Sequence, residues 1–268
     1  MSTAPTRSTA PSRSTAPTRS TLLLAVLHTR YQVLETIRIP VAVIGNMLFL
    51  ALAMFFFIVP QPTVAGDPVA ATAAAGQLAM FAVMSTCLFS FGLGAAEDRA
   101  TPFEPYVRTL PAGPVPRMIG RMLTGGVFAL LGLIPLVLIA WLFTDAAVTP
   151  RQTLLSLLVI IGVALPFLGL GLGIGYSMSP KAAIAVVQVV LFPMAFAGGL
   201  FMPPEAFPHW LDGFSQALPS RAGRDLLVEA LTGIDAAATS IPVLFGWGVL
   251  FAVFAVWAYR RDEGRRFR

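Results

Sequence analysis

Long apolar runs separated by short polar segments dominate this sequence of 268 residues. Six of the runs reach about 20 residues, the length that an α-helix rising 1.5 Å per residue needs to cross about 30 Å of hydrocarbon. None of the six contains Asp, Glu, Lys, Arg or His. The pattern predicts an all-α integral membrane domain over residues 40–259, with transmembrane helices at Pro40–Val59, Gln77–Ala96, Met122–Phe143, Leu154–Met178, Ala182–Phe201 and Ser240–Tyr259.

An amphipathic pattern precedes the first run, over residues 21–39. Apolar residues fall on one side of a helix there and polar residues on another: Leu23, Leu27, Tyr31 and Leu34 against His28, Gln32, Glu35 and Arg38. A basic amphipathic helix beside a membrane span is expected to lie in the headgroup layer, so we predict an interfacial helix on the cytoplasmic side. The alternative is that this segment extends the first span into the cytoplasm.

The two ends of the chain are basic. Residues 1–20 contain one six-residue unit written three times, as STAPTR, STAPSR and STAPTR. This segment has too little apolar surface to offset the entropy of ordering, which predicts a disordered, low-complexity tail. It lacks the apolar region of a signal peptide, so its removal is not expected. Residues 260–268 form a second, short basic tail.

Composition agrees with a membrane protein and argues against nucleic-acid binding. The chain is 56% hydrophobic and 12% charged, whereas soluble domains carry about 25% charged residues. Its net charge of +5 comes from short basic clusters between apolar runs. A nucleic-acid-binding surface would need a continuous basic stripe instead.

The distribution of Lys and Arg predicts the orientation, because cytoplasmic loops are enriched in both. With the amino terminus inside, all but three of the 18 basic residues lie on the cytoplasmic side, the exceptions being Arg151, Arg221 and Arg224. We therefore expect a multi-pass protein of the inner (plasma) membrane with both termini in the cytoplasm.

Two connections are longer than this topology requires, and long ordered loops commonly carry function. The cytoplasmic one, residues 97–121, mixes acidic and basic residues with an apolar edge formed by Phe103, Tyr106, Val107 and Leu110. A short apolar helix flanked by charges is suited to docking in a groove of a cytoplasmic partner. The alternative is an ordinary solvated loop.

The outer connection, residues 202–239, has the pattern of a broken helical hairpin. Pro203 and Pro204 end the fifth span, a short helix is expected over residues 206–214, and Leu218-Pro219 begins a second amphipathic piece. Trp210 is typical of a membrane interface. The pattern predicts a re-entrant or interfacial element, and the alternative is a surface loop lying on the membrane.

The sequence lacks the residues that ATP binding, metal binding and ion coupling require. No G-x-x-x-x-G-K-[ST] motif occurs, so the chain is not expected to be an ATPase or to hold a cofactor. His28 and His209 are predicted on opposite sides of the membrane, and Cys87 is a single cysteine, which leaves no metal site. No ionisable residue lies within a predicted span, which argues against proton or sodium coupling.

Glycines recur at every second position within the fourth span, at 169, 171, 173 and 175. A phosphate-binding loop would need a preceding strand, which is absent here. Small residues in a membrane helix more often allow close helix packing, and we expect that role.

Short motifs in the two long connections resemble those of a known family. They are Glu97-Asp98-Arg99, Tyr106-Val107-Arg108-Thr109-Leu110-Pro111 and Gly120-Arg121 in the cytoplasmic loop, and Gly199-Leu200-Phe201-Met202-Pro203, Phe207-Pro208-His209-Trp210-Leu211 and Ala217-Leu218-Pro219 in the outer segment. Together with the topology, they resemble the membrane subunit of ABC-2 type exporters, such as daunorubicin-resistance-like drug efflux permeases and polysaccharide-export permeases. The family's Gly-Thr-Leu-Glu piece is replaced here by Thr101-Pro102-Phe103-Glu104.

The resemblance implies a permease that lies in membrane lipid and pairs with a second permease chain and with a separate ABC ATP-binding subunit, which holds ATP and Mg. The cargo would be hydrophobic or amphiphilic: a drug, a lipid or a glycoconjugate. The resemblance also implies roles for residues of the two motifs: coupling to the ATPase for Glu97, Asp98, Arg99, Tyr106 and Arg108, and shaping an outer gate for Phe207, Trp210 and Leu211.

Two other functions remain open on the sequence. An ion-coupled secondary transporter would need a coupling-ion site. A membrane-embedded enzyme or assembly factor would need polar residues that converge on one pocket, and the candidates are His209, Asp212, Arg221, Arg224 and Asp225.

Overall fold

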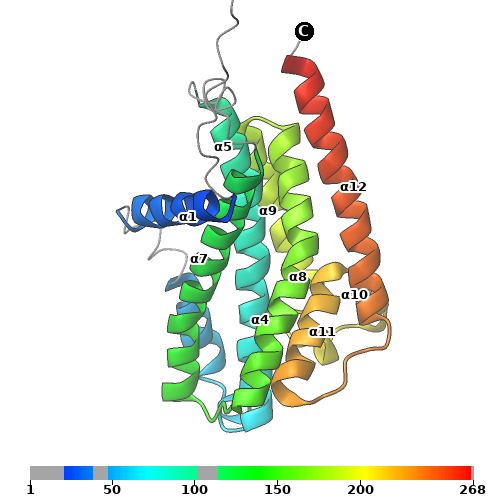
Figure 1. Cartoon of the computed structure of the whole chain (residues 1–268). Coiled ribbons are helices and arrows are strands. Elements are labelled where there is room, and N and C mark those ends of the chain that lie inside the picture. The colour runs from blue at the N-terminus through cyan, green and yellow to red at the C-terminus, as the bar shows by residue number, and fades with distance from the viewer. Residues whose placement is uncertain (1–20, 39–47, 102–113, 267–268) are drawn as a thin grey trace, which may run out of the picture.

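The structure is a computed structural model that describes residues 21–38, 48–101 and 114–266. Within these ranges the chain is helical and contains no strand, and five helices are long and apolar enough to cross a membrane. The long helices pack side by side along one direction, whereas α1 lies across them (Figure 1). The predicted all-helical architecture is confirmed.

The elements follow one another in a simple order along the chain. They are α1 (Thr21–Ile37), η1 (Met54–Ile58), α3 (Pro62–Ala65), α4 (Pro68–Cys87), η2 (Leu88–Leu93), α5 (Gly94–Ala100), α7 (Pro114–Phe143), α8 (Pro150–Ser177), α9 (Pro180–Ala197), η3 (Pro204–Ala206), α10 (His209–Ser215), α11 (Pro219–Thr232) and α12 (Ser240–Arg266). The elements η1 and η2 are π-helical, and η3 is a 3₁₀ turn.

The second to sixth predicted spans each match a helix, although the ends differ. The second span is a continuous rod of α4, η2 and α5 over Pro68–Ala100, much longer than predicted. The first predicted span falls partly on residues 39–47, outside the described residues. Its described part is helical over Leu48–Ile58, too short to cross a membrane alone. Five spans are therefore found, and the sixth stays a prediction.

Helix-start signals explain why two spans begin earlier than their apolar runs. The helices α4 and α8 each begin on a proline, whose missing N–H is tolerated at the first helical position. Asp67 accepts hydrogen bonds from the backbone N–H groups of Val69 and Ala70, which caps α4. Thr149 and Gln152 form a capping box at the start of α8. These polar caps lie outside the hydrophobic pattern that predicted the spans.

The rod of α4, η2 and α5 forms the centre of the bundle. In its apolar window 72% of the residues are buried, against 11% for α12. The helix α4 packs against α7, α8 and α11, and large side chains such as Met80, Met84 and Phe167 fill the core between them. The helices α7 and α12 leave many large apolar side chains exposed, as expected of a surface in contact with lipid.

Two glycines of α8 let it approach the central rod closely. A methyl group on Gly171 would lie 2.7 Å from the carbonyl oxygen of Cys87. A methyl group on Gly175 would lie 2.7 Å from the carbonyl oxygens of Phe91 and Gly92. Because the obstacles are backbone atoms, no larger residue fits at either position without a shift of a whole helix.

The other two glycines of the run face α12. A methyl group on Gly169 would lie 3.3 Å from the backbone of Phe251, and one on Gly173 would overlap the ring of Phe254. Residues four apart share a helix face, so the run at every second position serves two neighbours at once. The structure agrees with the predicted role in close packing.

Replacing Gly175 with valine is expected to destabilise the fold by about 3 kcal/mol or more, because the added methyl groups meet backbone that cannot move aside. Gly162, on the same helix, has open space around its Cα, so Gly162→Val is a matched control with an expected effect within about 0.5 kcal/mol. Thermal unfolding of the purified proteins in detergent measures both. Equal melting temperatures for the two variants would contradict this account of the packing.

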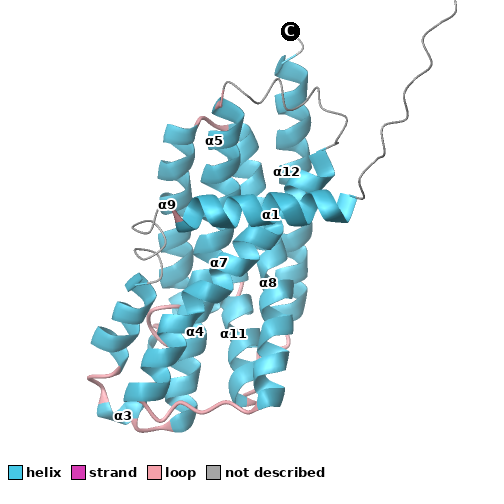
Figure 2. Ribbon diagram, turned by 60° about the vertical axis from the view of Figure 1, so that its left-hand side comes forward, coloured by secondary structure: helices cyan, strands magenta, loops and turns pink. Residues whose placement is uncertain are grey.

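The predicted helix at residues 21–39 is present as α1, which crosses α7 at Gly120 (Figure 2). The hydroxyl of Thr29 lies 3.2 Å from the carbonyl oxygen of Gly120, and the hydroxyl of Thr124 donates to Gln32 over 3.0 Å. A methyl group on Gly120 would lie 2.7 Å from the Cβ of His28, so glycine permits the crossing. Three large apolar residues of α1 are exposed: Leu23, Tyr31 and Leu34. The placement of α1 in the headgroup layer stays a prediction.

Candidate functional site

Arg99, near the end of the central rod, binds two other helices. Its Nη1 donates to the carbonyl oxygens of Gly175 and, over 3.1 Å, of Met178, at the C-terminal end of α8. Its Nη2 pairs with Asp262 of α12. The side chain of Arg99 is 18% exposed and that of Asp262 is 7% exposed, so the ion pair is largely buried. We call these four residues the Arg99 tether.

Aromatic rings lie against the Arg99 tether. The guanidinium carbon of Arg99 lies 5.9 Å from the centre of the Tyr176 ring, and Tyr176 meets Tyr259 edge to face at 5.1 Å. The carbonyl groups at a helix C-terminus carry partial negative charge, which attracts the arginine further. The start of the predicted cytoplasmic loop is thus bonded to α8 and α12 through the largely buried charge of Arg99.

A second ion pair joins the rod to α7, since Arg121 binds Asp98. Asp98 is 57% exposed, and pairs of this kind contribute about 0–1 kcal/mol. Glu97, the preceding residue, is exposed. Three neighbouring residues of one predicted motif therefore differ: Arg99 faces inward, Asp98 binds the adjacent helix, and Glu97 lies at the surface.

The other two predicted coupling residues, Tyr106 and Arg108, lie outside the described residues. The coupling roles of all five residues stay predictions. The tether adds Asp262, which the sequence did not single out. It stands 163 residues from Arg99, within a basic tail, and no spacing or periodicity indicates that the two meet.

Helices form most of the outer segment at residues 202–239. The predicted short helix corresponds to α10, and the piece predicted to begin at Leu218-Pro219 corresponds to α11. The hydroxyl of Ser220 donates to the carbonyl oxygen of Met194 over 2.7 Å, and Nε1 of Trp247 donates to that of Ala217 over 2.8 Å. The start of α11 is therefore bonded to α9, and Ala217, just before α11, is bonded to α12.

Four charged residues of the outer segment bind one another, and we call them the outer ion-pair cluster. Arg221 binds Asp225 through Nε at 2.8 Å and Asp212 through Nη1 at 3.2 Å. Arg224 binds Asp225 at 2.8 Å. Two positive and two negative charges cancel within the cluster. Arg224 and Asp225 are each 7% exposed. Each needs the opposite charge of the other to offset the desolvation penalty of burial.

The outer ion-pair cluster lies well inside the bundle. The helix α11 packs against α4, α8 and α12. A methyl group on Gly223, next to Arg224, would lie 2.7 Å from Val163 and 2.8 Å from Met80. Val163 follows the start of α8 by 13 residues, which corresponds to about 20 Å along the helix axis. The cluster is therefore close to the middle of α8 and not at its end.

The predicted gate residues lie on the first part of the outer segment. Phe207 follows η3, and Trp210 and Leu211 belong to α10. Trp210 is 74% exposed, whereas Phe207 and Leu211 are partly buried. His209 is exposed and takes no part in the ion pairs of the cluster. The five residues considered for an enzyme thus do not all converge, because only four of them come together.

Among the residues that the structure describes, no group of three His, Cys, Asp or Glu side chains is placed to hold a metal ion. Cys87 is buried, and its Sγ lies 3.6 Å from the carbonyl oxygen of Ala164 in α8. It occupies the position of a small packing residue between the rod and α8.

Comparison with known proteins assigns the chain to a family. The model of the ABC-2 type transporter family matches residues 23–232, which include most of α1 and every later element up to the end of α11. A protein of Bacillus subtilis (strain 168) named "Putative transport permease YvfS" is 24% identical over 186 residues, which are 69% of this chain and 76% of that protein. Because the family model spans well over half of the chain, this protein belongs to the ABC-2 type transporter family.

Proposed function

We propose that the chain is the membrane-spanning subunit of an ATP-driven exporter. The family indicates a transport permease with an ABC ATPase partner in general. In the proposed complex, a separate ATP-binding subunit holds ATP and Mg and binds the cytoplasmic loop at residues 97–121, and two permease chains pair in the membrane. Six spans, the first over residues 40–59, place both termini in the cytoplasm of a cell whose inner (plasma) membrane holds the complex.

The Arg99 tether is the observation that supports this mechanism best. It joins the start of the cytoplasmic loop to the ends of α8 and α12. When the partner closes on ATP and displaces the loop, the end of the central rod, α8 and α12 therefore move together. In this scheme Arg99 acts as a positioning residue within the permease, while Glu97, at the surface, contacts the partner.

The position of α11 favours a re-entrant outer segment over a surface loop. Its contacts with Val163 and Met80 place it about 20 Å from the start of α8, deep for a loop on the surface. The outer ion-pair cluster reduces the desolvation penalty of burying these residues at that depth, because its charges cancel. Phe207, Trp210 and Leu211 then lie where an outer gate would open toward α9.

Co-purification and transport test the proposed function. The tagged chain is co-expressed with a candidate ABC ATP-binding protein, and the purified complex is reconstituted with a fluorescent amphiphile as cargo. We expect the two proteins to co-purify and the amphiphile to move only with ATP and Mg. Equal movement by the permease chain alone, without any ATPase, would contradict the proposal.

The outer ion-pair cluster is the feature that most nearly supports an ion-coupled transporter instead. It contains two carboxylates, and both of them bind arginine, which leaves little negative charge for a cation. A proton or sodium gradient that drives flux in the same vesicles without ATP would favour this second function. A membrane-embedded enzyme is less favoured, because His209 stands apart from the cluster.

A further inference from the structure

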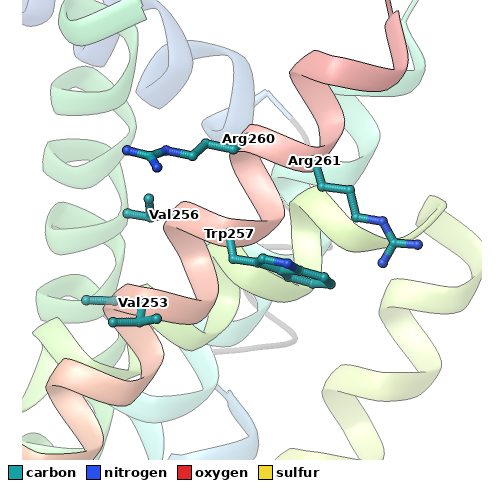
Figure 3. Close-up of a pocket in the computed structure, with 6 residues that line it drawn as sticks. Val253, Val256, Trp257, Arg260 and Arg261 are labelled. Carbon is teal, nitrogen blue, oxygen red and sulfur yellow. The ribbon is translucent and has the colours of Figure 1, made fainter.

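The last part of α12 carries a groove with one apolar end and one basic end. It has a volume of about 600 Å³ and is lined by Ala252, Val253, Val256, Trp257, Arg260 and Arg261. In Figure 3, Val256 lies below Arg260 and Trp257 lies below Arg261, so each arginine continues a row of side chains along the helix. Residues four apart share a helix face, which accounts for the two rows.

Both arginines of the groove are exposed and keep their charge available. Within the described part of the chain, no ion pair joins Arg260 or Arg261 to a carboxylate. The next residue, Asp262, is turned inward to Arg99. The guanidinium of Arg261 lies 5.1 Å from the centre of the Trp257 ring, a cation–π contact that positions it beside the groove.

The groove lies where a lipid headgroup region is expected. Its helix is the least buried of the five candidate spans, at 11% of the apolar window, and α12 stands at the edge of the bundle (Figure 1). Arginine next to tryptophan at the end of an apolar helix is typical of a membrane interface. The apolar part, Val253 and Val256, precedes the basic part by one to two helical turns, which matches an acyl chain below a phosphate.

We propose that this groove binds anionic phospholipid, with a phosphate at each arginine, since Arg260 and Arg261 point to opposite sides of the helix (Figure 3), and with acyl chains along Val253 and Val256. Arginine binds phosphate with a planar pair of donors, which suits a headgroup that carries a net negative charge. The assignment to the cytoplasmic leaflet rests on the proposed function and its orientation. A second copy of the chain on the same face would place arginine against arginine, which like-charge repulsion disfavours.

Fluorescence quenching tests the proposal on the full chain. The protein is placed in phosphatidylcholine vesicles that contain a small fraction of brominated phosphatidylglycerol or of brominated phosphatidylcholine. The signal of Trp257 is the difference between the wild type and Trp257→Phe. We expect the anionic lipid to quench this signal at a much lower fraction. We expect that preference to fall about fivefold for each arginine changed, in Arg260→Gln and Arg261→Gln.

Lys181→Gln is the matched control, because Lys181 is an exposed basic residue at the same end of the bundle. It should keep the preference. Equal quenching by both lipids, or an equal loss in Lys181→Gln, would overturn the proposal, since attraction would then depend on general surface charge. Full displacement by inorganic phosphate would also overturn it and assign the groove to a free phosphate. The assay contains no ATPase and no cargo, so its failure would leave the exporter function untouched.

Discussion

Replacing Arg99 with alanine is expected to abolish ATP-driven transport while leaving the ATP-binding subunit bound. The substitution removes the ion pair between Arg99 and Asp262, whose side chain is 7% exposed, and frees the end of α8. Breaking a buried pair on one side costs about 3–5 kcal/mol, which is enough to release α12 from the rod. We expect transport in the reconstituted complex to fall at least about tenfold, with continued ATP hydrolysis by the bound partner. Parallel assays of hydrolysis, transport and co-purification measure the three quantities.

Two further variants separate a tether from a docking contact. Glu97→Ala changes an exposed neighbour and is expected to weaken the binding of the ATP-binding subunit instead. The double variant Arg99→Ala/Asp262→Ala removes both charges. Its loss of stability should therefore be smaller than the sum of the two single losses, by about 0.5–3 kcal/mol. Release of the ATP-binding subunit by Arg99→Ala alone, in a chain that remains folded, would mean that Arg99 contacts the partner and does not act through α12.

Replacing Asp225 with alanine is expected to cause a large loss of stability. Asp225 stands between Arg221 and Arg224, and its removal leaves Arg224, 7% exposed, without an ion pair among the described residues. An unpaired charge at this depth costs about 3–5 kcal/mol. Thermal unfolding in detergent should show the loss as a large fall in melting temperature.

The control for this variant is Asp235→Ala, which removes an exposed carboxylate shortly after α11 and should change stability by less than about 0.5 kcal/mol. The double variant Arg224→Leu/Asp225→Leu removes a buried pair together and should recover most of the loss, because apolar replacements of a buried pair are often neutral. A double variant as unstable as Asp225→Ala would show that packing of α11, and not charge, accounts for the effect.

Hydropathy predicts five of these helices well because lipid imposes a strict requirement on span length and polarity. It fails at the helix ends, since Asp67 and Thr149 extend α4 and α8 through polar caps that an apolar run does not contain. It also places Arg221 and Arg224 in an outer loop. The structure buries Arg224 and half-buries Arg221 on α11, a helix that is too polar to stand out in a hydropathy pattern and too short to cross a membrane.

The candidate site was predictable only in part. The acidic-arginine motif lies where the rod ends, and the structure shows that Asp98 and Arg99 form ion pairs there, while their coupling roles stay predictions. Their partners come from distant helices: Arg121 from α7 and Asp262 from α12. Pairing across such distances leaves no periodic signal in a single sequence, because it depends on the packing angle of each helix and not on the local pattern.

The crossing of α1 over α7 has a consequence for how the chain is made. The two residues that meet there, Thr29 and Gly120, are 91 residues apart. A ribosome adds about 5–20 residues each second, so about 5–20 s pass between the synthesis of α1 and that of the part of α7 on which it docks. During that interval the central rod can already enter the membrane. Substitutions on the side of α1 that faces α7 should therefore spare insertion of the central rod and act on a later step of assembly.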